Sequence, residues 1–548
     1  TLTFADNIHL NDLELLTQLE NNILPDYLLK TKWFRGKKKN LYSCSISNSS
    51  SAIISGNEIN FLLVQVIYEN GEPEMYQLPI TYLAEEQSAD IQNNYPWAVI
   101  ANIQLKATKG ILVDAYYAPG LQQYLLNGFA EASSTNDFTF NSNTEINTFI
   151  KEHNNIFSKI HLSDELNTSI TYENKLFLKM YRRLETGINP DVEMTRHLTE
   201  HTTFNYLPAY YGSIVRNLDN ESLILGMMQP MIENHGDGKI FMKERINNFI
   251  ERILAGDAGK IDPARHLGKL TQPIGYEELP HDLQLFIGNP ASEQSSLLGI
   301  RTAQMHLALA NQTTDKEFNP EEFSLHYQRS LFSSMQTLVR EVFQQIEPSK
   351  NQLSIDAKME IESLSGKKDD ILNLLKKIYT KKLDIIRTRV HGSYHLENIL
   401  LTGKDISIQN FGGDISRNYS EQRIKRSPLF DVAYMIRSFY YIAHEGFSGS
   451  THIPKETLQQ LLPFAWTWAY YISGFFMKAY LQTVTDSRII PPGKDDLEML
   501  LQVFLLERAL YALNYELINR PGKTIVPLNL IYSILNVDKN QENENSKH

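Results

Sequence analysis

Two short polar segments in the C-terminal half of the chain carry residue types whose spacing suits phosphoryl-transfer chemistry. Residues 391–400 read His-Gly-Ser-Tyr-His-Leu-Glu-Asn-Ile-Leu, and Asn398 follows Ser393 by five positions. Phosphoryl-transfer enzymes use this spacing for an Asp that accepts the proton of the substrate hydroxyl and an Asn that holds magnesium. Ser393 stands at the position of the Asp, and a serine hydroxyl is not a useful base near neutral pH.

The second segment, residues 410–413, reads Asn-Phe-Gly-Gly and follows the predicted strand 406–409. An Asp-Phe-Gly element with a metal-binding Asp stands at this place in kinases, so Asn410 removes a second negative charge. Loss of the general base alone costs about 10²–10⁴ in rate, or about 3–5 kcal/mol. Glu397 and Asp414 lie nearby in sequence, and spacing alone leaves open whether either one compensates.

The whole chain resembles one family, the maltokinases, which phosphorylate maltose to maltose 1-phosphate and often occur beside or fused to trehalose synthase. The resemblance extends from about residue 33 to about residue 527. It implies an α+β fold of the protein-kinase-like, aminoglycoside phosphotransferase-like type, bilobal, with an N-terminal β-rich cap and a large helical C-lobe. Six segments in the family's order carry it, namely residues 32–37, 175–185, 189–193, 301–306, 426–433 and 515–521.

The length of 548 residues exceeds the size at which a single core usually stops growing, so several packed regions are expected. The stretch 131–148 is dense in Ser, Thr and Asn and is predicted to be a linker. The remaining predicted boundaries are a cap over 1–130, a nucleotide-binding N-lobe over 149–231, a sugar-binding C-lobe over 232–537 and a disordered tail over 538–548.

The resemblance implies ATP and Mg²⁺ as cofactors. Lys179 ends a predicted strand and Glu193 follows on a predicted helix, a separation that suits the kinase pair that orients the phosphates. Gln229 and Met231 are the predicted hinge at the adenine edge. Asn167 lies in the segment 165–169, where the phosphate-covering loop is expected, although this segment has no glycine. Asn398 and Asn410 are the degenerate metal positions.

A sugar pocket for maltose or a related disaccharide is expected on the C-terminal helices. Its predicted residues recur at helical spacing, and a further one lies upstream; an aromatic stripe of this kind is also common in a protein core. The candidates are Arg437, Tyr511, Tyr515, Glu516 and Arg520. Asp431 is expected to brace the catalytic loop.

Composition argues against nucleic acid and membrane partners. The net charge is −12, and residues 35–39 are the one notable basic run, whereas nucleic-acid binding needs clustered Lys and Arg. Residues 461–481 are about as long as a membrane span. Pro463, Gly474 and Lys478 favour a buried helix instead.

Two further features bear on metal and compartment. His197, Glu200 and His201 match the H-x-x-E-H pattern of certain zinc proteases, but they fall on the helix that carries Glu193 and are predicted not to bind zinc. With Cys44 as the single cysteine and no signal peptide at the start, the chain is expected in the cytoplasm.

Two functional hypotheses follow from these residues. The first is a pseudokinase of the maltose and trehalose to α-glucan pathway, serving as a binding or scaffold domain linked to trehalose synthase. The second is an active maltokinase that uses ATP. The chain begins with Thr1, which predicts a portion excised from a longer polypeptide, and the cap is the predicted surface for contact with trehalose synthase.

Overall fold

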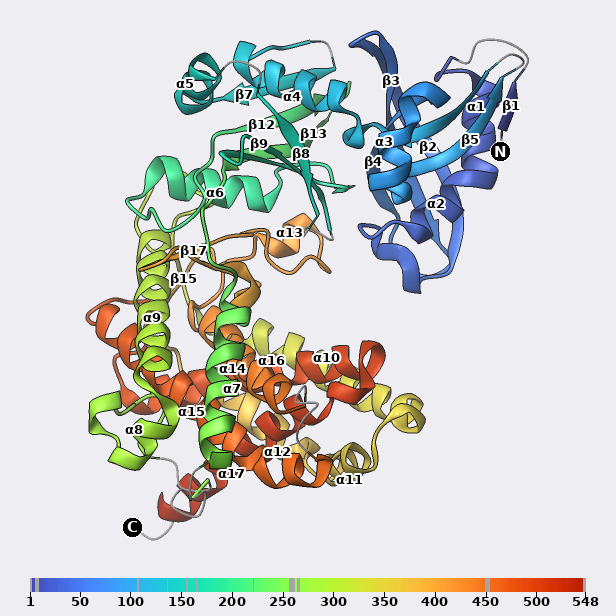
Figure 1. Cartoon of the computed structure of the whole chain (residues 1–548). Helices are drawn as coiled ribbons and strands as arrows, with labels where there is room; N and C mark the ends of the chain where they lie inside the picture. The colour runs from blue at the N-terminus through green and yellow to red at the C-terminus, as the bar shows by residue number, and fades with distance from the viewer. Residues whose placement is uncertain are drawn as a thin grey trace. The chain divides into compact units, whose positions relative to one another are not determined.

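The computed structural model describes residues 2–545 apart from positions 5–8, 106–107, 136, 154–155, 163–165, 220, 256–261, 264–266 and 449–453. The chain divides into two compact units (Figure 1). The first unit contains residues 1–199 and 208–232, and the second contains residues 200–207 and 233–548.

The first unit opens with a mainly antiparallel sheet of order β1-β5-β6-β4-β3-β2, in which the short β11 pairs with β4 (Figure 1). Its strands are β1 (Leu2–Phe4), β2 (Leu41–Ile54), β3 (Asn57–Tyr68), β4 (Glu74–Ala84), β5 (Val99–Leu105), β6 (Lys109–Asp114) and β11 (Arg183–Leu184). The helices of this part are α1 (Leu13–Gln18), α2 (Leu24–Lys30), α3 (Glu85–Asn94) and α4 (Pro119–Glu131).

Both faces of this sheet are buried, and β3 shows why. Successive side chains of a strand point to opposite faces. Leu62 and Val64 join a core that includes Leu24 of α2. Phe61 and Leu63 join a second core, which extends into the next sheet. The predicted β-rich cap is therefore a sheet that is covered on two sides.

The second sheet of this unit has the order β7-β12-β13-β10-β9-β8. Its strands are β7 (Phe138–Ser142), β8 (Ser158–His161), β9 (Thr168–Tyr172), β10 (Leu176–Met180), β12 (Gly212–Asn217) and β13 (Ser222–Pro230), and it is accompanied by α5 (Thr144–Glu152) and α6 (Pro190–His201).

The stretch 131–148, predicted as a linker, is largely ordered structure. It contains β7 and the start of α5, and β7 pairs with β12 along residues 138–142. Phe138 and Phe140 are both buried while Thr139 between them is not, which is the alternation of a half-buried strand. Because Ser, Thr and Asn are frequent here, the short run of alternating apolar residues was not recognised as a strand from the sequence.

A buried ion pair joins the cap sheet to the segment that follows β10. Arg182 donates to Asp114 at the end of β6, and both side chains are fully buried. Its Nε also donates to Thr168 Oγ1 at 2.7 Å, and its guanidinium stacks on Trp33 and Tyr116. Because buried charges are costly unless paired and hydrogen-bonded, this network ties the cap and the predicted N-lobe into one unit.

The second unit is mostly helical. Its elements are α7 (Gly238–Ala255), α8 (His281–Ile287), α9 (Asn289–Leu309), β14 (Glu321–Glu322), α10 (Leu325–Ser349), α11 (Ile355–Ser365), α12 (Lys368–Lys376), β15 (Ile386–Arg387), β16 (Ile399–Leu401), β17 (Ile406–Ile408), α13 (Tyr419–Gln422), α14 (Leu429–Ser448), α15 (Lys455–Thr483), α16 (Lys494–Asn519) and α17 (Ile525–Asn545).

The aromatic segment 461–481 lies within α15, which packs against α9 and α14 and buries Trp468 and Tyr480. Among the described residues, no helix has the length and apolar character needed to span a bilayer. Helix α17 continues into the tail as far as Asn545. Residues 546–548 lie outside the described part of the chain.

Candidate functional site

The loop between β15 and β16 carries Ser393 and closely approaches the segment after β17. Gly392 has a φ of +78° and Gly413 a φ of +70°. A Cβ on Gly392 would lie 3.1 Å from the Cα of Gly413, which is tighter than nearly all real contacts of this kind. Glycine at these positions therefore permits both the left-handed backbone and the close approach of the two loops.

Asp431 in the first turn of α14 fixes the start of this loop. Its carboxylate accepts the backbone N–H of His391 at 2.7 Å and of Gly392 at 2.9 Å. The ring of His306 contacts Asp431 Oδ2 at 3.2 Å and Tyr480 OH at 3.0 Å, and all three side chains are buried. The bracing contact that the sequence predicts for Asp431 is present, whereas His306 and Tyr480 were not predicted.

Asn398 and Asn410 are brought together as the kinase pattern requires, but they bond to each other. Asn410 Nδ2 donates to Asn398 Oδ1 at 2.9 Å, and Asn398 Nδ2 donates to the carbonyl of Ser393 at 2.8 Å. Asn410 has a φ of +64°, a region that few residues other than glycine and asparagine adopt. These contacts form a chain of uncharged hydrogen bonds from Asn410 through Asn398 to the Ser393 carbonyl.

The side-chain oxygens of Asn398 and Asn410 are poor ligands for a divalent cation. Mg²⁺ in nucleotide sites is usually held by carboxylates together with the phosphates, and here the two amide oxygens carry no charge. One of them, Asn398 Oδ1, already accepts a hydrogen bond from Asn410. Within the described ranges, no three His, Cys, Asp or Glu side chains gather as a metal-binding group, including around His197 and His201 of α6.

Asp414 is close to the loop but is committed to other contacts. A Cβ on Gly392 would lie 4.0 Å from its backbone nitrogen. Its carboxylate accepts hydrogen bonds from Tyr511 OH and Ser416 Oγ, each at 2.7 Å. Burial raises the pKa of Asp414, but the hydrogen bonds from Tyr511 and Ser416 outweigh it and lower the pKa below the ordinary value. Such a carboxylate is a weaker base than a free one.

Glu397 belongs to the loop itself, and its carboxylate is paired. Its carboxylate is 2.6 Å from Lys239 Nζ and 3.6 Å from His395 Nδ1. Burial alone would raise the pKa of Glu397, but Lys239 lowers it below the usual range. Burial lowers the pKa of the neighbouring His395 to about 4. His395 is therefore neutral near pH 7, and neither residue supplies an unpaired base.

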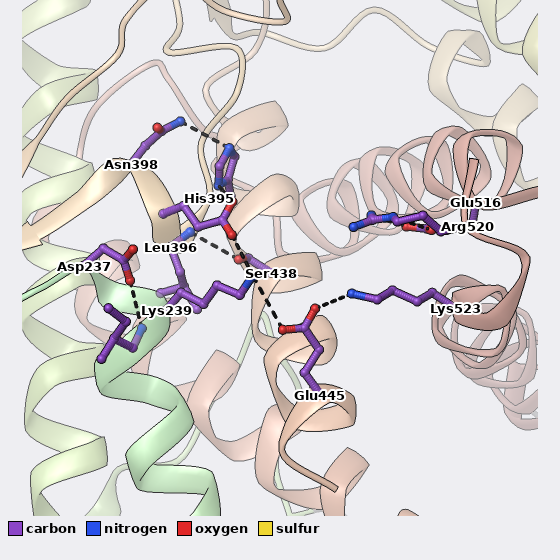
Figure 2. A network of polar contacts seen from close by, with 12 residues as sticks. Asp237, Lys239, His395, Leu396, Asn398, Ser438, Glu445, Glu516, Arg520 and Lys523 are labelled. Atoms are coloured by element: carbon purple, nitrogen blue, oxygen red, sulfur yellow. Dashed lines mark hydrogen bonds and ion pairs between the residues drawn. The ribbon is translucent and has the colours of Figure 1, made fainter. Parts of the chain in front are cut away.

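The predicted sugar residues lie on α14, on α16 or directly after α16, and some of them contact one another. Glu516 is buried and is bound by Tyr441 OH at 3.0 Å and by Arg520 through two hydrogen bonds. Arg520 stacks over Tyr515, which is almost half exposed. Figure 2 shows Arg520 beside Glu516 and, nearby, Glu445 between Lys239 and Lys523.

The other two predicted sugar residues have different neighbours. Tyr511 is held by Asp414, and burial followed by the Asp414 charge raises the pKa of Tyr511 to about 12. Arg437 stacks on Tyr434 and Tyr441, with its guanidinium carbon 4.3 and 5.4 Å from the ring centres. Tyr441 thus links Arg437 to Glu516, a connection that spacing along the sequence does not reveal.

In the first unit, Lys179 of β10 makes an ion pair at the start of α6. Its ammonium is 2.9 Å from Asp191 Oδ2, and both side chains are only 8% exposed. Tyr181 OH donates to the same oxygen at 2.9 Å. Asn189 caps the helix by accepting the N–H of Asp191 at 3.0 Å.

Asp191 is a partner of Lys179 that the sequence did not predict. Glu193, the predicted partner of Lys179, lies two residues further along α6 with a half-buried side chain. Asp191 was not predicted, although an acid directly after Asn189 and Pro190 is a usual helix-start signal. That signal places Asp191 in the first turn of the helix.

The remaining nucleotide candidates surround the ends of β9 and β13. Gln229 Nε2 donates to the carbonyl of Pro208 at 2.8 Å. The backbone N–H of Met231 donates to Lys175 at 2.7 Å, so this group is engaged within the sheet. Asn167 lies just before β9, and residue 165 of the predicted phosphate-covering loop is outside the described residues.

The comparisons with known proteins concern the cap and the fold. Residues 27–117 match the model of the maltokinase N-terminal cap domain. The structure is similar to glucosamine kinase in complex with glucosamine, ADP and inorganic phosphate, with a TM-score of 0.56 and 14% sequence identity over 90% of this chain and 94% of that chain. A second crystal form of glucosamine kinase gives 0.57 and 14% over 91% and 95%.

At this identity the structural likeness establishes the fold. It covers both units and confirms the predicted α+β kinase-like architecture with a sheet-rich N-terminal part and a large helical C-terminal part. The cap match is an independent finding from the sequence of residues 27–117. Together they show a maltokinase-type cap in residues 27–117, within a chain whose fold is similar to that of glucosamine kinase.

Proposed function

We propose that this chain is a sugar-binding, maltokinase-like protein whose phosphotransferase activity is strongly impaired. The observation that carries the proposal is the direct hydrogen bond between Asn410 and Asn398, at the two positions where a kinase holds its metal. Ser393 beside them has no carboxylate to accept a proton. Glu397 and Asp414, the nearest acids in sequence, are engaged with Lys239 and Tyr511.

The size of the impairment follows from the missing groups. A general base contributes about 10²–10⁴ to the rate, and a charge that offsets the phosphates during transfer contributes further. Both losses act in the same transition state. We therefore expect turnover far below the typical value of about 10 s⁻¹.

The proposed ligands are maltose or a related disaccharide and, in weakened form, ATP with Mg²⁺. A glucosamine kinase of the same fold has been crystallised with glucosamine and ADP, which supports a sugar ligand here. Glu516, Arg520 and Arg437 are the proposed polar contacts, and Tyr511 and Tyr515 the proposed aromatic ones. The buried pair of Lys179 and Asp191 is the proposed nucleotide contact.

The direct test is ATP-dependent phosphorylation of maltose by the purified chain, with nucleotide and maltose binding measured in parallel by calorimetry. We expect maltose binding without appreciable maltose 1-phosphate. Efficient formation of maltose 1-phosphate would overturn the proposal and establish the second candidate, an active maltokinase. That candidate draws support from the retained Asn398 and from the retained ion pair of Lys179.

A role beside trehalose synthase is the proposed context, in the conversion of maltose and trehalose to α-glucan. Its support is the maltokinase-type cap over residues 27–117. The single cysteine, the buried Cys44, favours the reducing cytoplasm as the compartment.

Co-expression with a trehalose synthase followed by size-exclusion chromatography tests this association. We expect co-elution through an interface of more than about 1,000 Å². Substitution of exposed cap residues such as Tyr42 and Ile53 on β2 should weaken it. Substitution of the exposed Met359 on α11 is the matched control. Separate elution of the intact proteins would count against the association.

A further inference from the structure

Arg437 on α14 is a cation whose hydrogen-bonding groups are not used within the described part of the chain. Its guanidinium lies against the rings of Tyr434 and Tyr441, and its Nε is buried without an acceptor. Among the described residues it forms neither a hydrogen bond nor an ion pair. A guanidinium offers five N–H donors in a rigid fork, so stacking orients these donors while leaving them unpaired.

Three carboxylates of this part of the second unit are paired with other cations. Glu397 is 2.6 Å from Lys239, Glu445 is 2.6 Å from Lys523, and Glu516 is bound by Arg520. Figure 2 shows Arg520 beside Glu516 and Lys523 reaching Glu445. The positive charge of Arg437 therefore has no carboxylate of its own among these three.

Arg437 is connected to the loop that carries Ser393. The ring of His395 lies 6.2 Å from the ring of Tyr434, on which Arg437 stacks. His395 Nε2 is 3.3 Å from Asn398 Nδ2, which in turn donates to the carbonyl of Ser393. In an active kinase an acid at position 393 would repel a phosphorylated sugar. Ser393 and Asn410 remove both negative charges from this region.

We propose that Arg437 binds the phosphate of a phosphorylated sugar, so that this chain prefers a sugar phosphate to the neutral sugar. The proposal rests on the proposed sugar-binding function and names its ligand class. The planar fork of arginine matches two phosphate oxygens, and charge-assisted hydrogen bonds of this kind are about twice as strong as neutral ones. The ligand keeps its phosphate, since no transfer step is involved.

Isothermal titration calorimetry on the full chain tests the preference. The probes are maltose, maltose 1-phosphate, glucose 1-phosphate, ADP and inorganic phosphate. We expect maltose 1-phosphate to bind at least about tenfold more tightly than maltose, because a charged hydrogen bond is gained. Inorganic phosphate should bind more weakly than either sugar phosphate, and ADP should not compete with them.

Arg437→Gln should lower the affinity for maltose 1-phosphate by about tenfold to a hundredfold and should weaken maltose binding less, so that the preference for the sugar phosphate shrinks. Ser393→Asp should act in the same direction, because it restores a negative charge near the phosphate. Arg245→Gln on α7 is the matched control. Arg245 also stacks on an aromatic ring, Phe241 at 4.6 Å, and has a buried Nε without an acceptor.

Circular dichroism verifies the fold of each variant, and Arg437→Lys, which keeps the charge but loses the fork, should give an intermediate loss. Equal affinity for maltose and maltose 1-phosphate would overturn the inference and leave the impaired-kinase proposal intact. So would a preference that Arg437→Gln and Arg437→Lys leave unchanged, tight binding of inorganic phosphate alone, or competition by ADP. Efficient ATP-dependent phosphorylation of maltose would instead overturn the proposed function.

Discussion

The two ends of the loop that carries Ser393 differ in their charge and in their contacts. At the first end, the buried carboxylate of Asp431 accepts hydrogen bonds from two backbone N–H groups and contacts His306, so both of its oxygens are engaged. At the other end, Ser393, Asn398 and Asn410 are uncharged and contact one another. The contacts that hold the loop are thus separate from the groups that would do the chemistry. A fold of this kind can persist after its reactive acids are lost.

Introducing acids at positions 393 and 410 should produce the largest change in phosphotransferase activity. The double variant Ser393→Asp with Asn410→Asp should raise maltose phosphorylation by about 10²–10⁴ over the parent chain, since base and metal ligand act in one transition state. Each single variant should gain much less. A coupled assay of ADP release measures this.

The control for the double variant is Lys179→Met in the same background, which should abolish the gain. Purely additive or absent gains would show that the reactive end of the loop has changed in further ways. Restoring activity would then require substitutions beyond positions 393 and 410.

Removing the bracing acid should affect stability instead of activity. Asp431→Ala leaves buried donors unpaired and should lower the free energy of unfolding by about 3–5 kcal/mol. Ser393→Ala at the reactive end should change it by less than about 0.5 kcal/mol. Urea denaturation followed by circular dichroism checks both, and equal losses would remove the distinction between the two ends.

Acid should weaken the second unit through its buried histidines. Burial lowers the pKa of His395 and of His444 to about 4, below the ordinary value of about 6.5. Between these values the unfolded chain binds protons that the folded chain does not, so stability falls as the pH decreases from about 6.5 to 4.

The expected loss is about 1–3 kcal/mol for each histidine. Thermal unfolding at pH 7, 6 and 5 measures the trend. His395→Gln and His444→Gln should each flatten it, while His281→Gln on α8, at an exposed position, should not. A trend unchanged in both buried-site variants would contradict the assignment.

Zinc should have the smallest effect. His197 and His201 belong to α6, and no third ligand group accompanies them among the described residues. Metal analysis of the purified chain should show no stoichiometric zinc, and chelation should leave the melting temperature unchanged. One zinc per chain that is lost in His197→Ala would overturn this expectation.

The sequence by itself determined the order of the motifs, the helix that begins after Asn189 and the presence of the uncharged residues Ser393 and Asn410 at the two positions predicted for reactive acids. These are local properties: a Pro at the first helical position and a five-residue spacing require no knowledge of distant contacts. The cap was also predictable, because apolar strands such as β3 are bounded by turn residues.

Tertiary structure decided which charges pair. Lys179 pairs with Asp191, Arg182 reaches Asp114 in the cap, and Tyr441 joins Arg437 to Glu516. The physical reason is that a buried charge takes the partner that packing brings within hydrogen-bond distance, and spacing along the chain does not encode that distance. For the same reason β7 joins the second sheet although its composition indicated a linker, since burial of Phe138 and Phe140 depends on the strand beside them.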